Sequence, residues 1–130
     1  MRDTISISIG IALPGGRYKP VIKANSPVPM TKGYKVGTSQ DNQETFHIDV
    51  FQGESMLVHE NEYLGTLLFS DLPVGKKGEV KMNIEFTVTE ECILKVTATH
   101  PETGRTEEAL LVTYDTPPSL KEAAQAATPA

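Results

Sequence analysis

The sequence predicts an all-β fold: an antiparallel sandwich of two sheets with about eight short strands and a short helical or disordered C-terminal tail. Three observations predict it. Apolar and polar residues alternate with a period of two in most apolar segments, as at Ile5, Ile7, Ile9 and Ile11. Glycine, proline and asparagine separate these segments at short, regular spacing. No long amphipathic helix stands between them, which argues against a parallel α/β sheet.

The first expected strand covers residues 4–11, where a β-branched residue stands at every second position. Pro14-Gly15-Gly16 then turns the chain. Residues 18–22 form a second strand, which Pro20 places at a sheet edge because proline lacks an amide donor. Prolines stiffen the loop that follows, at residues 25–29.

The middle of the chain is organised by the segment from Ser39 to Glu54. Asp41 and Asn42 favour a turn, because their side chains bond to the nearby backbone and tolerate unusual backbone angles. This turn joins a strand at residues 33–38 to one at 44–51, and Gly53 ends the second of them. The other expected strands cover residues 64–69, 80–88, 93–98 and 106–114.

One domain is expected over residues 3–116, because 130 residues suffice for one domain and are few for two. Residues 117–130 form the tail. Pro117-Pro118 ends the last strand, and Ser119 to Glu122 has the spacing of a helix capping box. We expect the tail to be the start of a helix or a disordered end.

Composition narrows the class of partner and compartment. The net charge is −5 and the pI is about 5.1, which argues against nucleic acid or an anionic membrane as the main partner. Cys92 is the sole cysteine, so no intrachain disulfide forms, and a reducing, cytoplasmic location is expected. No apolar segment approaches the length of a membrane-spanning helix.

Catalytic and metal-binding patterns are absent from the sequence. There is no phosphate-binding loop of the form GxxxxGK[ST], and the three histidines lie in separate segments. His47 and Asp49 share a strand face, for which a solvated surface is the simpler interpretation. Glu90-Glu91 indicates a solvated turn, and Cys92 a buried small residue. We therefore expect no enzyme activity from this chain, no metal and no cofactor. The function that remains is the binding of an extended peptide.

Eight short motifs stand in order along the chain: Ser8-Ile-Gly-Ile11, Pro14-Gly15-Gly16, Asn25-Ser-Pro-Val-Pro29, Asp41-Asn42-Gln43, Val50-Phe-Gln-Gly-Glu54, Asn61-Glu-Tyr-Leu64-Gly65, Ile93-Leu-Lys-Val96-Thr-Ala98 and Thr103-Gly104-Arg105. In order and spacing they resemble the substrate-binding domain of the heat-shock protein 70 family, the DnaK-type chaperones. The first resembles the family's Ser-Leu-Gly-Ile, and the third its Asn-Thr-Thr-Ile-Pro. The chain looks like a divergent member.

The resemblance implies a two-layer β-sandwich that holds short, extended, apolar segments of unfolded client proteins. In that family an ATPase domain, which binds ATP, precedes this domain, and a helical lid follows it. The linker to the ATPase domain would end just before Asp3, and the lid would begin near Ser119. We thus expect a piece of a longer ATP-dependent chaperone. Co-chaperones are further expected partners, and the tail after Pro118 is a candidate to enter the groove of a second copy.

The resemblance alone assigns ten residues of this chain to the binding site. Pro14 and Ser39 would arch over the peptide. Leu13, Gly37 and Ser39 would supply backbone partners, together with the strand around His47. The groove itself would be lined by Ile11, Leu13, Val36, Phe46, Ile48 and Met82.

Some of these positions depart from the family pattern. Pro14 and Ser39 stand where bacterial relatives commonly have Met and Ala. Phe46 stands where the central pocket usually has the smaller Val. A pocket filled by Phe46 would forfeit roughly 1.5–3 kcal/mol from burying a client leucine.

The alternative is a regulatory or scaffold module on the same fold, its pocket plugged by Phe46. Without the resemblance, Ile11, Phe46 and Ile48 would be interpreted as core.

Overall fold

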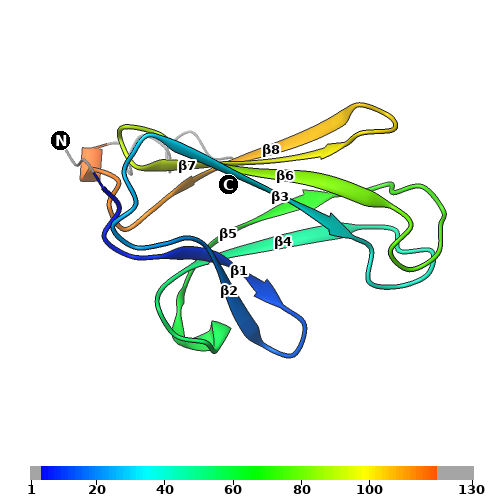
Figure 1. The fold of residues 1–130 in the computed structure, drawn as a ribbon, viewed down its shortest axis with the longest axis horizontal. Coiled ribbons are helices and arrows are strands. Elements are labelled where there is room, and N and C mark those ends of the chain that lie inside the picture. The colour runs from blue at the N-terminus through cyan, green and yellow to red at the C-terminus, as the bar shows by residue number, and fades with distance from the viewer. Residues whose placement is uncertain (1–3, 120–130) are drawn as a thin grey trace.

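Two antiparallel four-stranded sheets pack face to face in the computed structural model, which describes residues 4–119 (Figure 1). The strand orders are β2-β1-β4-β5 and β3-β6-β7-β8. The eight strands are β1 (Ile9–Leu13), β2 (Arg17–Ile22), β3 (Met30–Gly37), β4 (Phe46–Gln52), β5 (Glu62–Phe69), β6 (Lys81–Val88), β7 (Ile93–His100) and β8 (Arg105–Val112), with a short 3-10 helix η1 (Val58–Glu60) between β4 and β5. The predicted all-β sandwich is confirmed.

The core lies between the sheets and depends on the period-two pattern. In β6, Met82, Ile84, Phe86 and Val88 are buried and alternate with more exposed residues. Strand β7 repeats the alternation, and Cys92 just before it is buried, as predicted. This regular half of the sandwich is the platform that supports the candidate site.

The N-terminal strand is shorter than expected, because β1 begins at Ile9. Before it, Thr4 forms an isolated antiparallel bridge with Pro27, and two carboxylates bind the backbone of the residues between that bridge and β1. The Ser6 N–H and hydroxyl donate to the two oxygens of Asp115 at 2.8 and 2.7 Å. The Ser8 N–H and hydroxyl donate to those of Glu54, both at 2.8 Å. These bonds satisfy the backbone locally and tie the start of the chain to two distant segments.

The sheets meet closely along one side of the sandwich and separate along the other. At the closed side, Gly65 of β5 lies against the Leu111 side chain of β8, and a Cβ at this position would force that side chain to shift. At the open side, β2 and β3 are the outer strands of their sheets. Pro20 lies in β2, and its predicted edge position is confirmed. In Figure 1 the β1–β2 hairpin diverges from β3 and β4.

The last residues of the described range, Pro118 and Ser119, have helical backbone. The expected capping box from Ser119 to Glu122 and the rest of the tail lie outside the described residues, as does Asp3. Within residues 4–119, no helix has the length and apolar character needed to span a membrane.

Candidate functional site

A groove of about 580 Å³ opens between β1, β3 and β4. Its volume falls in the range of ligand-binding pockets. Its walls come from the end of β1 and the turn after it, from the end of β3 and the loop to β4, and from the start of β4. The lining residues are Ile11, Ala12, Leu13, Pro14, Tyr34, Val36, Gly37, Ser39, Gln43, Phe46, His47, Ile48 and Asp49.

Nine of the ten residues named from the sequence lie around this one groove. The tenth, Met82, does not line it. Met82 is fully buried and stands opposite Val36 in the β3–β6 ladder, so it belongs to the core beside the groove wall. Four lining residues were not foreseen: Ala12, Tyr34, Gln43 and Asp49. Tyr34 could have been predicted from the sequence, because it stands two residues from Val36 in the same strand and therefore on the same face.

The floor of the groove is apolar. Ile11 and Ile48 are buried, whereas Leu13, Val36 and Phe46 are half-buried and pack against the core. Phe46 stands opposite Phe69 in the β4–β5 ladder. The groove remains open beside Phe46. An apolar side chain placed there would be removed from water on several sides, which is the main source of affinity in such sites.

The loop between β3 and β4 is braced from within by Gln43. The Ser39 N–H donates to the Gln43 Oε1 at 2.9 Å, and the Gln43 Nε2 donates to the Thr45 carbonyl at 2.7 Å. Asn42 has φ 53°, a left-handed angle that asparagine tolerates, so the predicted turn is present. The Ser39 N–H is thus engaged inside the loop.

The same loop is held from outside by the segment between β5 and β6. The Asn42 N–H donates to the Gly75 carbonyl and the Lys77 N–H donates to the Asp41 Oδ1, both at 2.7 Å. Gly78 donates to the Thr38 carbonyl at 2.8 Å. Two loops far apart in sequence therefore fix one wall of the groove before any ligand arrives, which lowers the entropy lost on binding.

The opposite wall is the β1–β2 turn. Pro14 is exposed there, and Gly15 and Gly16 have φ 84° and 75°, which only glycine adopts at little cost. The turn is supported from behind, because the Val58 N–H donates to the Gly16 carbonyl at 3.0 Å. Leu57, just before Val58, is 46% exposed at this end of the molecule.

Polar groups in the groove are few. The Asp49 Oδ1 accepts a bond from the Thr66 hydroxyl at 2.7 Å, and the Thr45 hydroxyl lies 3.3 Å from the His47 Nε2. In residues 4–119, no three His, Cys, Asp or Glu side chains are grouped so as to hold a metal ion. An apolar floor with scattered polar groups suits the binding of a chain segment.

Tyr34 forms part of the groove wall and was missed by the sequence reasoning. Its ring centroid lies 5.9 Å from that of Phe86. Its hydroxyl is buried without a hydrogen-bond partner among the described residues. Burial raises the pKa of Tyr34 above the usual value for tyrosine, so the hydroxyl is neutral at physiological pH.

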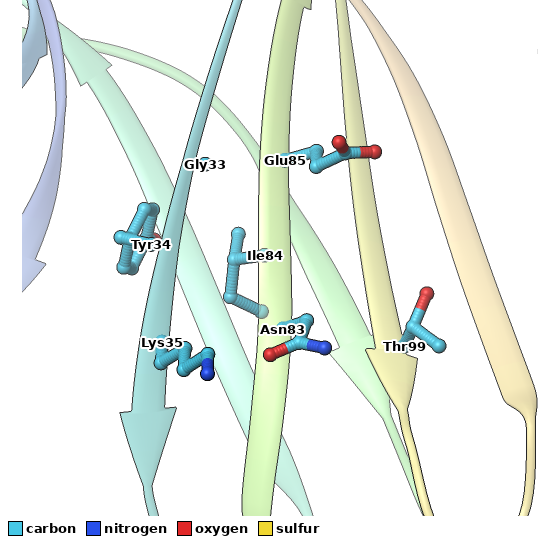
Figure 2. A pocket seen from close by; sticks show the side chains of 7 residues that line it. All are labelled: Gly33, Tyr34, Lys35, Asn83, Ile84, Glu85 and Thr99. Atoms are coloured by element: carbon cyan, nitrogen blue, oxygen red, sulfur yellow. The ribbon is translucent and has the colours of Figure 1, made fainter.

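A second, shallower hollow lies on the outer face of the other sheet, and we call it the outer hollow. Figure 2 shows its polar side chains on β3, β6 and β7, which are neighbours in the sheet. Its volume is about 490 Å³, and it is lined by Gly33, Tyr34, Lys35, Asn83, Ile84, Glu85 and Thr99. It contains none of the residues named from the sequence. Because its rim is polar, an apolar ligand would bury less apolar surface in the outer hollow than in the groove.

Comparison with known proteins gives one consistent result. The family described as Hsp70 protein matches residues 1–126. The chain is 30% identical over 105 residues to the chaperone protein DnaK of Psychrobacter cryohalolentis, and this alignment covers 81% of the chain and 16% of that relative. It is 33% identical over 103 residues to the DnaK of Mycoplasmoides gallisepticum, covering 79% and 17%. It is 32% identical over 105 residues to the chaperone protein dnaK1 of Prochlorococcus marinus, covering 81% and 16%. The chain thus spans about a sixth of the length of these curated relatives.

Proposed function

The chain belongs to the Hsp70 family, and we propose that it is the peptide-binding module of a DnaK-type chaperone, holding short extended apolar segments of unfolded proteins. The observation that carries this proposal is the groove. Nine of the residues that the family resemblance names for peptide binding surround one open, apolar-floored cavity. We assign this module to residues 3–116.

Binding would combine two kinds of contact. An extended segment would bond through its backbone to groups on both walls, at Leu13, Gly37, the Ser39 carbonyl and the strand around His47. Its apolar side chains would enter the cavity over Ile48 and beside Phe46. Pro14 and Ser39, from the two opposite walls, would close over it.

The chemistry of the whole protein would then be divided between domains. ATP binding and hydrolysis would belong to a separate ATPase domain, and this module would use no cofactor or metal of its own. A helical lid following residue 119 and co-chaperones would regulate access, and the site of action would be the cytoplasm. Insertion of the tail after Pro118 into the groove of a second copy would be a form of self-association.

The alternative, a scaffold module whose pocket is plugged by Phe46, predicts a closed groove. The open groove of about 580 Å³, which Phe46 helps to line, favours binding over plugging. The two functions give opposite results with a peptide.

The test is a fluorescence-anisotropy titration of the 130-residue chain with a labelled, leucine-rich heptapeptide. We expect saturable binding with Kd near micromolar, on the order of −8 kcal/mol. Val36→Asp, which places a charge in the groove wall, should abolish it. Leu110→Asp is the matched control, because Leu110 is 66% exposed on β8 and does not line the groove. Absence of binding up to millimolar peptide would favour the plugged scaffold.

A further inference from the structure

Charge is distributed unevenly along this acidic chain. Between Thr4 and Gln40 there is no Asp or Glu, although the net charge of the whole chain is −5. The same stretch contains Arg17, Lys19, Lys23, Lys32 and Lys35. It forms β1, β2 and β3, so the open side of the sandwich, where β2 and β3 are the outer strands, is basic.

A cleft of about 280 Å³ lies on this open side, and we call it the flank cleft. Lys19 and Lys32 approach it from the two different sheets, and both are exposed. The cleft is lined by Lys19, Pro20, Val21, Lys32, Gly33 and Tyr34, with no carboxylate among them. The ion pairs found within residues 4–119 lie elsewhere, between Lys95 and Glu108 and between Arg105 and Glu107. Among the described residues, two cations therefore line one cleft, and neither forms an ion pair.

The flank cleft adjoins the groove at Tyr34, which lines both. The Lys19 Nζ lies 6.0 Å from the centroid of the Tyr34 ring. Lys19 also stands opposite Ile11 in the β1–β2 ladder, and Ile11 lines the groove. In Figure 2 the Tyr34 ring lies beside β3 on the side away from β6, at the strand edge that faces this open side. A chain segment that leaves the groove past Tyr34 therefore enters the cleft that both lysines line.

Negative charge is found elsewhere around the groove. Asp41 and Glu44 lie in the β3–β4 loop with Ser39 and Gln43, and Asp49 lines the groove itself. The Asp49 carboxylate already accepts the Thr66 hydroxyl. The groove thus has two cations and no lining carboxylate in the cleft at Tyr34, whereas its β3–β4 end has both signs of charge, because Lys76 and Lys77 lie against the loop that holds Asp41 and Glu44. This asymmetry discriminates between ligand orientations, because like charges repel.

We propose that the flank cleft binds a carboxylate side chain of the same segment whose apolar part occupies the groove. The module would then select apolar segments with an acidic residue on the Tyr34 side and reject those with a basic residue there. This inference rests on the proposed function and names its substrate class. Because both lysines are exposed, the preference should be about three- to tenfold in Kd and should weaken with salt.

The experiment uses three labelled heptapeptides with one leucine-rich core. One has Glu at its N-terminal end, one has Glu at its C-terminal end, and one has Gln at both. Titrations with the 130-residue chain should give tighter binding for one of the two Glu peptides than for the Gln peptide. The Lys19→Gln/Lys32→Gln double variant should lose this preference and bind the Gln peptide as before. Lys95→Gln, which removes a cation on β7, should keep the preference.

The outcomes separate the two proposals. If the Gln peptide does not bind at all, the proposed function of the groove fails. If the Gln peptide binds and both Glu peptides bind equally well, the function stands and the flank cleft is overturned as a carboxylate site. A preference that survives in the double variant would overturn it too, since the carboxylate would then be bound elsewhere. Thermal unfolding of the double variant, expected to match that of the original chain, verifies its fold.

Discussion

Strands β3 and β6 are neighbours that pair over eight residues, yet they differ in what their inward side chains meet. Along β6, Met82, Ile84, Phe86 and Val88 are all buried. Along β3, no residue is fully buried, and Tyr34 and Val36 remain half-exposed. The reason is the opposite layer, because β6 faces the packed interior and β3 faces the groove and the flank cleft.

The difference shows how a sandwich acquires a binding site without special residues. The same alternating pattern produces core where a second sheet covers it, and an apolar wall where the second sheet diverges. An apolar strand whose inward side chains stay half-exposed is therefore informative, since a folded chain normally buries such a surface. Stability should depend on β6, and ligand binding on β3 and the strands around it.

The largest expected effect comes from making one substitution on both strands. Val88→Ala on β6 removes two buried methyl groups and leaves a cavity, so it should lower the free energy of unfolding by about 2–3 kcal/mol. Val36→Ala on β3 should lower it by about 1 kcal/mol or less and should weaken peptide binding. Urea unfolding measures the first quantity and anisotropy the second. Equal destabilisation by both substitutions would contradict the distinction between the strands.

Phe46→Val tests whether the groove binds an apolar side chain more tightly when the half-buried Phe46 ring is replaced by a smaller group. The space released should admit a client leucine more deeply, so affinity for the leucine-rich heptapeptide should rise by roughly 1.5–3 kcal/mol, or about ten- to a hundredfold. Isothermal titration calorimetry measures the change. An unchanged Kd would mean that Phe46 does not contact the ligand.

Tyr34→Phe should make β3 more like β6. The substitution removes a buried hydroxyl that has no partner among the described residues and leaves the packing against Phe86 intact. We expect the free energy of unfolding to rise by about 1 kcal/mol, because an unpaired buried polar group is destabilising. The urea midpoint measures it. A loss of stability would show that the hydroxyl has a partner in solution.

Alkaline pH should weaken the fold through two tyrosines. Burial, reinforced by the Glu54 carboxylate, raises the pKa of Tyr18 to about 12, and burial also raises the pKa of Tyr34 above its ordinary value. Unfolded tyrosine ionises near pH 10, so above about pH 10 the unfolded chain holds fewer protons than the folded one. Stability then falls as pH rises. Urea unfolding between about pH 8 and pH 11 should show a smaller fall for Tyr34→Phe, and parallel curves would contradict this assignment.

The sequence predicted the fold well because period-two alternation is a local signal. It predicted the strands around Ile48 and Ile84 and the edge position of Pro20. It missed the late start of β1, because the carboxylates that hold Ser6 and Ser8 come from distant Asp115 and Glu54. Local periodicity contains no information about such partners.

Family resemblance named nine residues that line the groove, and there is a physical reason why the tenth does not line it. Val36 and Met82 stand opposite each other in one ladder, and residue-by-residue transfer does not reveal that only Val36 reaches the groove. Tyr34 lies in the strand expected at residues 33–38 but was given no role at the site, because its exposure depends on how far β2 diverges from β3. The flank cleft requires both strands in place, so no single segment predicts it.

The most direct test of the central claim is to map a bound peptide on the isotopically labelled chain by amide chemical shifts. On titration with the leucine-rich heptapeptide, the account predicts that the amides of Leu13, Gly37 and Ile48 shift together and saturate at near-micromolar Kd, while those of Val96 and Ala98 in β7 stay in place. No shifts up to millimolar peptide, or shifts confined to the outer hollow at Asn83 and Thr99, would contradict it.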